Sequence, residues 1–91
     1  MPKVIDLTDQ NGKNLTHYIE CPACGYGHGF DARWSFNGDY EKPTFRPSML
    51  VNANSPQLGP RCHSFVTDGK IQFLSDCSHQ FAGQTMDLPD V

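Results

Sequence analysis

Apolar and polar residues alternate with a period of two along much of this chain, as in half-buried β-strands. The clearest alternation covers residues 64–67 and 70–74, on either side of Asp68-Gly69. Asp-Gly favours a type I′ turn, because both central positions of that turn need a positive φ angle. The pattern predicts a hairpin in which Val66 lies opposite Ile71 and in which Cys62 and Cys77 share one face.

Other short segments also suit strands, separated by turn residues. Residues 14–20 and 33–36 alternate, residues 48–51 are apolar, and residues 1–13 offer an edge strand. Pro43 and Pro47 predict that the segment between them is extended without being a regular central strand. Residues 80–84 are expected to form one helical turn that ends at Gly83. The whole chain therefore predicts one mainly β domain over residues 1–91, a small antiparallel sheet with little or no helix.

The composition indicates that hydrophobic burial alone does not stabilise this fold sufficiently. A chain of 91 residues with a mean hydropathy of −0.51 buries a small core, so a metal or disulfides should help to hold it. No apolar run reaches membrane-spanning length, and the N-terminal residues contain no apolar signal segment. We expect a cytoplasmic protein with no membrane association, in which four cysteines are metal ligands rather than disulfides.

The first half of the expected metal site is Cys21-Pro22-Ala23-Cys24-Gly25. Two thiolates three positions apart can clamp one ion, while amides inside the turn donate to the sulfur atoms, and Gly25 suits the tight backbone that follows. This spacing predicts a zinc knuckle of the kind found in zinc ribbons. His17 and His28 are expected to be surface or hydrogen-bonded residues.

The second half is expected on the hairpin, with Cys62 and Cys77 as the preferred ligands. Strand alternation places His63 on the face opposite to Cys62. His79 has the same parity as Cys77 and is the alternative fourth ligand. Zinc accepts either set, and iron is a minor alternative because thiolates also bind it.

Catalytic and nucleic-acid readings of the same residues are less favoured. Cys62-His63 and the run from Asp76 to His79 look superficially like catalytic pairs, but sequence neighbours in a strand point to opposite faces. Aromatic and cationic side chains could form a stacking surface for single-stranded nucleic acid, although aromatic residues at strand spacing more often fill a core. The residues concerned are Trp34, Phe36, Tyr40 and Phe45 with Arg33, Lys42 and Arg46.

Longer motifs resemble a family of small proteins of tailed phages and prophages. The resemblance covers residues 21–91 and rests on CPxC, on WSFNGDYEKPTFxPS beginning at Trp34, on RCHSFVTDGKIQFLSDCSH beginning at Arg61, and on AGQTMDLPD beginning at Ala82. Such proteins are often labelled ammonia monooxygenase or anaerobic dehydrogenase, yet this chain shows neither a two-histidine-plus-carboxylate spacing nor a copper set. The resemblance implies a phage gene product in a bacterial host, with zinc.

These observations predict a binding protein that is not an enzyme. The expected partner is a host or virion protein. The protein would act as an inhibitor of a host factor or defence complex, or as an accessory of the virion. Its expected location is the bacterial cytoplasm, with the virion as the alternative. A nucleic-acid-binding zinc ribbon is the alternative function.

Overall fold

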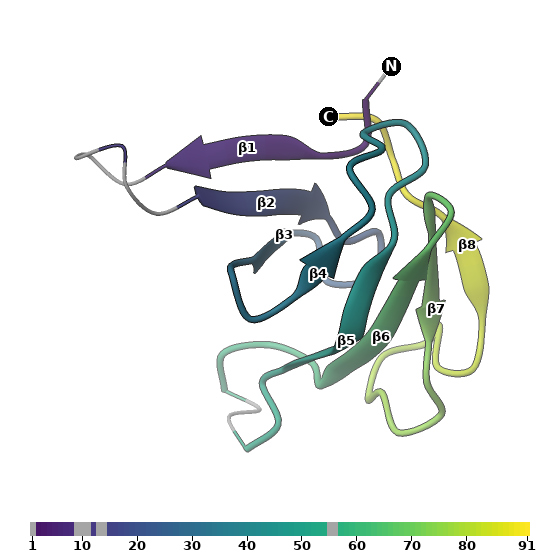
Figure 1. The fold of residues 1–91 in the computed structure, drawn as a ribbon. Coiled ribbons are helices and arrows are strands. Elements are labelled where there is room, and N and C mark those ends of the chain that lie inside the picture. The colour runs from purple at the N-terminus through teal and green to yellow at the C-terminus, as the bar shows by residue number, and fades with distance from the viewer. Residues whose placement is uncertain (1, 9–11, 13–14, 55–56) are drawn as a thin grey trace.

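The computed structural model describes residues 2–8, 12, 15–54 and 57–91, and within them the chain forms two antiparallel β-sheets and no helix. The smaller sheet has the order β1 (Ile5–Thr8), β2 (Leu15–Glu20), β3 (Gly27–Phe30). The larger sheet has the order β4 (Ser35–Phe36), β5 (Phe45–Val51), β6 (Cys62–Thr67), β7 (Lys70–Phe73), β8 (Thr85–Asp87). In Figure 1, β1 and β2 run across the strands of the larger sheet. The predicted mainly β fold is confirmed, with two sheets where one was expected.

The β6–β7 hairpin has the register that its sequence predicts. Val66 lies opposite Ile71 and Ser64 opposite Phe73. Asp68 and Gly69 have φ angles of 51° and 78°, as a type I′ turn requires. The turn packs on the chain segment before β5, because the Gly69 N–H donates to the Pro43 carbonyl oxygen at 2.9 Å.

β5 is a central strand with one irregularity, at Pro47. Its pairing with β6 passes from Phe45 opposite Val66 to Met49 opposite Ser64, so four steps along β5 match two steps along β6. Proline has no N–H to donate to the ladder, which is the reason that a bulge is found at such a position. The segment between Pro43 and Pro47 was expected to be extended but not regular throughout. The bulged strand agrees with this expectation.

Residues 80–84 form a series of turns and no helical turn, in contrast to the expectation. The Ala82 N–H donates to the His79 carbonyl oxygen, and Gly83 has a φ angle of 81°. Residue 14 and part of residues 1–13, where strands were also predicted, lie outside the described residues. Because the described residues contain no helix, they offer none that could cross a membrane.

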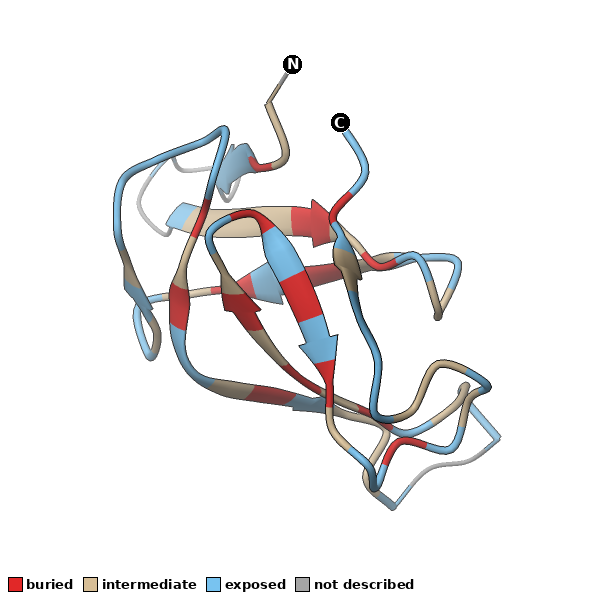
Figure 2. Cartoon of the chain, turned by 90° about the vertical axis from the view of Figure 1, so that its right-hand side faces the viewer, coloured by how far each residue is buried: buried red, intermediate tan, exposed pale blue. Residues whose placement is uncertain are grey.

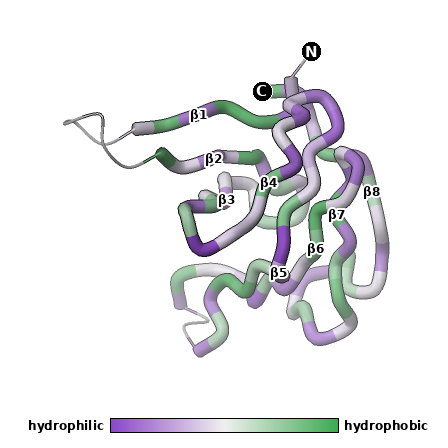
Figure 3. Tube along the Cα trace, in the orientation of Figure 1, coloured by the Kyte–Doolittle hydropathy of each residue, from purple (hydrophilic) through white to green (hydrophobic). Residues whose placement is uncertain are grey.

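The core lies between the two sheets, and buried residues alternate regularly along β6 and β7. Along β7, exposed and buried residues alternate, which Figure 2 shows as pale blue and red segments. The corresponding alternation of hydrophilic and hydrophobic positions appears along the tube in Figure 3. Phe45 stacks between Phe30 and Phe36, with ring centroids 4.1 Å and 4.8 Å away, and is only 1% exposed. Phe30 and Phe45 therefore fill the core, whereas Phe36 is half-buried and Tyr40 is exposed.

Candidate functional site

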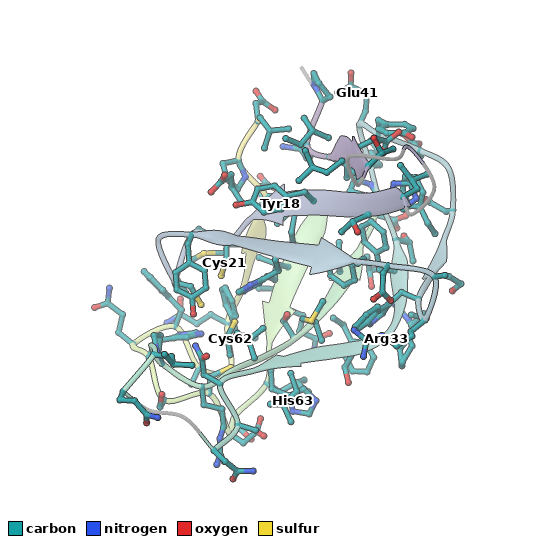
Figure 4. The ribbon with its side chains drawn as sticks, turned by 90° about the vertical axis from the view of Figure 1, so that its left-hand side faces the viewer. Tyr18, Cys21, Arg33, Glu41, Cys62 and His63 are labelled. Carbon is teal, nitrogen blue, oxygen red and sulfur yellow. The ribbon has the colours of Figure 1, made fainter. Side chains whose placement is uncertain are left out.

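The two faces of β6 present different chemistry. Cys62, Ser64 and Val66 are buried between the sheets, whereas His63, Phe65 and Thr67 are partly exposed on the outer face. Strand geometry requires this alternation, because successive side chains point to opposite sides. Figure 4 shows His63 projecting away from Cys21 and Cys62, which lie inside the molecule.

On the outer face, a serine, a histidine and an aspartate form a continuous hydrogen-bonded chain. Ser48 Oγ lies 3.0 Å from His63 Nε2. His63 Nδ1 lies 3.1 Å from Asp76 Oδ2 and 3.2 Å from Asp76 Oδ1. An ionised carboxylate can only accept, so Nδ1 carries the proton and Nε2 is left to accept from the serine hydroxyl. This is the order of groups in a Ser-His-Asp catalytic triad.

Pairing between β5 and β6 brings the serine to the histidine. Leu50 lies directly opposite His63. Ser48 precedes Leu50 by two residues and therefore projects from the same face, one diagonal position away. Regular pairing without the Pro47 irregularity would place Ser48 itself opposite His63, so the bulge sets the diagonal geometry.

Asp76 comes from the segment that follows β7, which lies against β6. The Leu74 N–H donates to the His63 carbonyl oxygen at 2.8 Å. Ser78 and Arg61 exchange two hydrogen bonds, from the Ser78 N–H to the Arg61 carbonyl oxygen at 3.0 Å and from the Arg61 N–H to Ser78 Oγ at 2.7 Å. Residues 74–78 are thus hydrogen-bonded to β6 and the residue before it at both of their ends, which keeps the Asp76 carboxylate beside the His63 imidazole.

The serine-histidine-aspartate group is open to solvent on the outer face. The His63 and Asp76 side chains are 25% and 46% exposed, and the apolar Leu50 beside them is 48% exposed. The Trp34 indole N–H donates to the Ser48 carbonyl oxygen at 3.4 Å, and Trp34 also lines a hollow of about 700 Å³ with Leu15, Thr16, His17, Asp31, Ala32 and Arg33. Trp34 thus contacts both the backbone of Ser48 and this hollow.

On the inner face, Cys21, Cys24, His28 and Cys62 form a group that can hold a metal ion. Their ligand atoms all lie within 4.8 Å of one another. The knuckle has the expected form: the Cys24 N–H donates to Cys21 Sγ at 3.4 Å, and Gly25 has a φ angle of 77°. Cys62 arrives from β6 and His28 from β3, so the group joins the two sheets.

The geometry of this group fits a tetrahedral ion. Cys21 Sγ and Cys62 Sγ are 3.9 Å apart, close to the edge of about 3.8 Å of a tetrahedron with metal–sulfur bonds near 2.3 Å. His28 is 3% exposed, and its Nε2 atom is buried with no hydrogen-bond partner among the described residues. Buried polar atoms are nearly always paired, and a ligand bond from His28 to an ion held by this group would pair this nitrogen.

The three thiols of the group also differ in how easily they ionise. A hydrogen bond from the Cys62 thiol lowers the pKa of Cys21 to about 3, and the same contact raises the pKa of Cys62. Burial raises the pKa of Cys24 to about 11. The cluster therefore concentrates negative charge on Cys21, next to the other sulfur atoms, and a cation would relieve this arrangement.

The other two predicted ligands, Cys77 and His79, are not members of this group. Cys77 is outside the metal-ligand group: its Sγ accepts from the His63 N–H and its thiol donates to the His63 carbonyl oxygen, both at 3.2 Å. His79 Nδ1 accepts from the Phe81 N–H at 3.2 Å, and its ring packs against Phe73. The structure thus brings Cys21, Cys24 and Cys62 together as predicted and adds His28 in place of Cys77 or His79.

The comparison with protein families identifies the group to which this sequence is related. Residues 2–74 match the family BubE, described as a bacterial ubiquitination-like system serine protease. The chain belongs to the BubE family. The matched range includes Ser48 and His63 and ends two residues before Asp76. No curated protein and no solved structure matches the chain.

This membership overturns the expectation that the protein is not an enzyme, because the BubE family is one of serine proteases. Adjacent residues such as Cys62 and His63 cannot act together as nucleophile and base, because a strand places them on opposite faces. Ser48, His63 and Asp76 come instead from three segments that meet only in the sheet. The family match does not bear on the resemblance to phage proteins, which stays a prediction.

Two residues of these candidate groups, Ser48 and His28, could not be recognised from the sequence for a similar reason. The sequence did indicate that His63 faces away from the metal ligands, but Ser48 could be recognised only from the pairing of β5 with β6. His28 follows Cys24 by four residues, a spacing compatible with ligation, and its role becomes visible once β3 places it beside Cys21. No local pattern distinguishes such a histidine from one that is merely hydrogen-bonded.

Proposed function

We propose that this protein is a serine protease that cleaves a protein substrate in a bacterial ubiquitination-like system, using Ser48 as its nucleophile. The observation that carries the proposal is the chain of contacts from Ser48 Oγ through the His63 ring to the Asp76 carboxylate. The name of the BubE family supports the same chemistry. The earlier expectation of a protein partner becomes, in this proposal, the expectation of a protein substrate.

Each member of the triad has a defined role in the proposed reaction. Ser48 Oγ attacks the carbonyl carbon of the scissile bond while His63 Nε2 takes the hydroxyl proton. His63 then gives this proton to the leaving amine, and an acyl group remains on Ser48. Water attacks the acyl-enzyme with His63 again as the base, which releases the acid product and restores the serine.

Asp76 acts through His63 and does not need to touch the substrate. Its carboxylate accepts the Nδ1 proton, which leaves Nε2 free to accept from Ser48, and it stabilises the imidazolium that forms during attack. The solvent exposure of His63 and Asp76 places the reaction on an open face, where an extended protein segment can approach.

We propose that the inner group binds a structural zinc ion through Cys21, Cys24, His28 and Cys62. Four protein ligands leave no open position for substrate, so the ion would stabilise the fold and take no part in the hydrolysis. Zinc suits this set because three thiolates and one imidazole are among its common tetrahedral ligands. Cys62 precedes His63 directly, so an ion in this group would also anchor the strand that carries the base.

A fluorophosphonate probe, which reacts with activated serine hydroxyls, tests the proposal without a known substrate. The purified protein should be modified at Ser48, as located by mass spectrometry of the digested chain. Ser48→Ala and His63→Gln should abolish labelling, whereas Ser35→Ala, a serine on β4 that bonds the Arg46 carbonyl oxygen, should label normally. Absence of any label on Ser48 in a folded, metal-loaded protein would refute the serine protease assignment.

A further inference from the structure

Cys77 lies in an unusual contact with the backbone of the catalytic histidine. Its sulfur accepts from the His63 N–H and its thiol donates to the His63 carbonyl oxygen, at 3.2 Å in each case. The residue is 8% exposed, so water does not compete freely for these groups. The thiol therefore satisfies the His63 N–H where β7 has already ended, and it is a second donor to the His63 carbonyl oxygen, which also accepts from the Leu74 N–H at 2.8 Å.

The place of Cys77 in the chain gives this contact a consequence for catalysis. Cys77 is bonded covalently to Asp76, and its thiol is bonded through two hydrogen bonds to His63. The two residues that must keep a distance of 3.1 Å between Nδ1 and the carboxylate are thus joined a second time, through their backbones. Two independent links between the same segments restrict sliding of the aspartate along the imidazole.

Two other roles for Cys77 fit the contacts less well. As a metal ligand it would have to lie with the inner group, which consists of Cys21, Cys24, His28 and Cys62 without it. As a simple space-filling residue it would need no polar partners, yet both the acceptor and the donor capacity of the thiol are used.

We propose that Cys77 is a positioning residue that holds Asp76 and His63 in catalytic register through its two hydrogen bonds to the His63 backbone. This proposal rests on the proposed function, since it assigns a role within the same triad. It predicts that the polarity of the residue at position 77, and not only its volume, controls the reactivity of Ser48.

The test compares Cys77→Val, which keeps much of the volume and removes both hydrogen bonds, with Cys77→Ser, which keeps a group able to donate and accept. The second-order rate of fluorophosphonate labelling at Ser48 should fall about 100-fold in Cys77→Val, because small displacements of catalytic groups have effects of this size. In Cys77→Ser it should stay within about tenfold of the parent, since a shorter hydroxyl makes the same bonds less well. Zinc content, measured by elemental analysis, should remain at the parent level in both variants.

A second readout reports on the His63–Asp76 contact without any reaction. The Nδ1 proton of an imidazole bonded to a carboxylate gives a low-field proton resonance, which should weaken or move in Cys77→Val and persist in Cys77→Ser. Asp76→Asn identifies the resonance, and a dispersed amide spectrum shows that each variant is folded. If Cys77→Val fails to fold, Cys77→Ala takes its place, because it also removes both hydrogen bonds, and the same loss of labelling rate and of the low-field resonance is expected in it.

Each outcome bears on the proposal. Parent-like labelling and an unchanged low-field resonance in folded Cys77→Val would overturn it, as would loss of zinc from either variant, which would make Cys77 a ligand. If the parent protein itself is not labelled at Ser48, the proposed protease function fails, whereas the low-field resonance still decides whether Cys77 positions the His63–Asp76 pair.

Discussion

The inner and outer faces of β6 carry sites of opposite character at adjacent residues. Cys62 points inward to a closed group of buried ligands, and His63 points outward to an open hydrogen-bonded triad. This difference suits the two proposed roles, because a structural ion is held best where water is excluded and a protease nucleophile must meet its substrate. A single strand can serve both because its side chains alternate.

The comparison also shows an asymmetry between the two sites. The inner group joins β3, β6 and the knuckle, so its loss should disturb the strand that carries His63. The outer triad lies on a formed sheet, so its loss should leave the inner group intact. The following experiments test this dependence, beginning with the change expected to have the largest effect.

Removal of the metal should destroy both sites together. Binding energy in small zinc domains appears as folding free energy, on the order of 10 kcal/mol, so a chelator should abolish the β signal in circular dichroism and the labelling of Ser48. Cys24→Ser should have the same effect, whereas His17→Gln should retain metal and fold. Release of the metal with an unchanged spectrum would show that the inner group does not stabilise the fold.

Asp76→Asn should break the outer site alone. The amide can no longer hold the imidazole in the required tautomer, and the equivalent change in a well-studied triad lowers kcat by about 10⁴-fold. Fluorophosphonate labelling should fall steeply, while zinc content and the circular dichroism spectrum stay at the parent level. Asp39→Asn, in the turn between β4 and β5, is a matched control that should label normally. A labelling rate in Asp76→Asn close to that of the parent would remove Asp76 from the triad.

His28→Gln should weaken the inner site and distinguish its ligands. Even loss of a residue that only supports a ligand lowers metal affinity about 10- to 100-fold, so removal of a ligand should lower it by at least that factor. His79→Gln should leave the affinity unchanged, because His79 lies outside the group. Competition with a chromophoric zinc chelator measures the zinc affinity of both variants. The opposite ranking of the two variants would restore His79 as the fourth ligand.

The smallest expected effect is a change in folding stability on removal of a second aspartate–histidine pair, Asp6 and His17. Asp6 accepts from the Tyr40 hydroxyl at 2.6 Å and contacts His17 Nδ1 at 2.7 Å, and the hydrogen bond from Tyr40 is the main cause that lowers the pKa of Asp6. A lowered carboxyl pKa stabilises the fold above the unfolded value and loses this contribution as pH falls through the folded value, below about pH 4. Because Asp6 is 38% exposed, the contribution should not exceed about 1 kcal/mol.

Urea unfolding at pH 5 and pH 3 measures this contribution as the difference between the parent and Asp6→Asn. The parent should lose slightly more stability on acidification than the variant, and Ser48 labelling at neutral pH should be the same in both. An equal loss in the two proteins would show that the Asp6 contacts do not contribute. A change in labelling would show that β1 and β2 influence the catalytic face.

Local features of this chain were predictable because neighbouring residues determine them. Asp68-Gly69 specified the hairpin turn and its register, and Cys21 and Cys24 specified the knuckle. Alternation along β6 also placed Cys62 and His63 on opposite faces, which is the basis of both sites. Each of these inferences depends on side-chain period or turn chemistry within a few residues.

The composition of each site was decided by pairing between distant segments. Ser48 reaches His63 only because β5 pairs with β6 across the Pro47 irregularity, and Asp76 reaches it only because residues 74–78 fold back on β6. His28 becomes the fourth member of the inner group through the position of β3 beside the knuckle. The amino-acid sequence by itself determined which side chains share a face, since that depends on local backbone geometry. Only the tertiary structure decided which of them meet, since that depends on long-range sheet register and on how the two sheets pack.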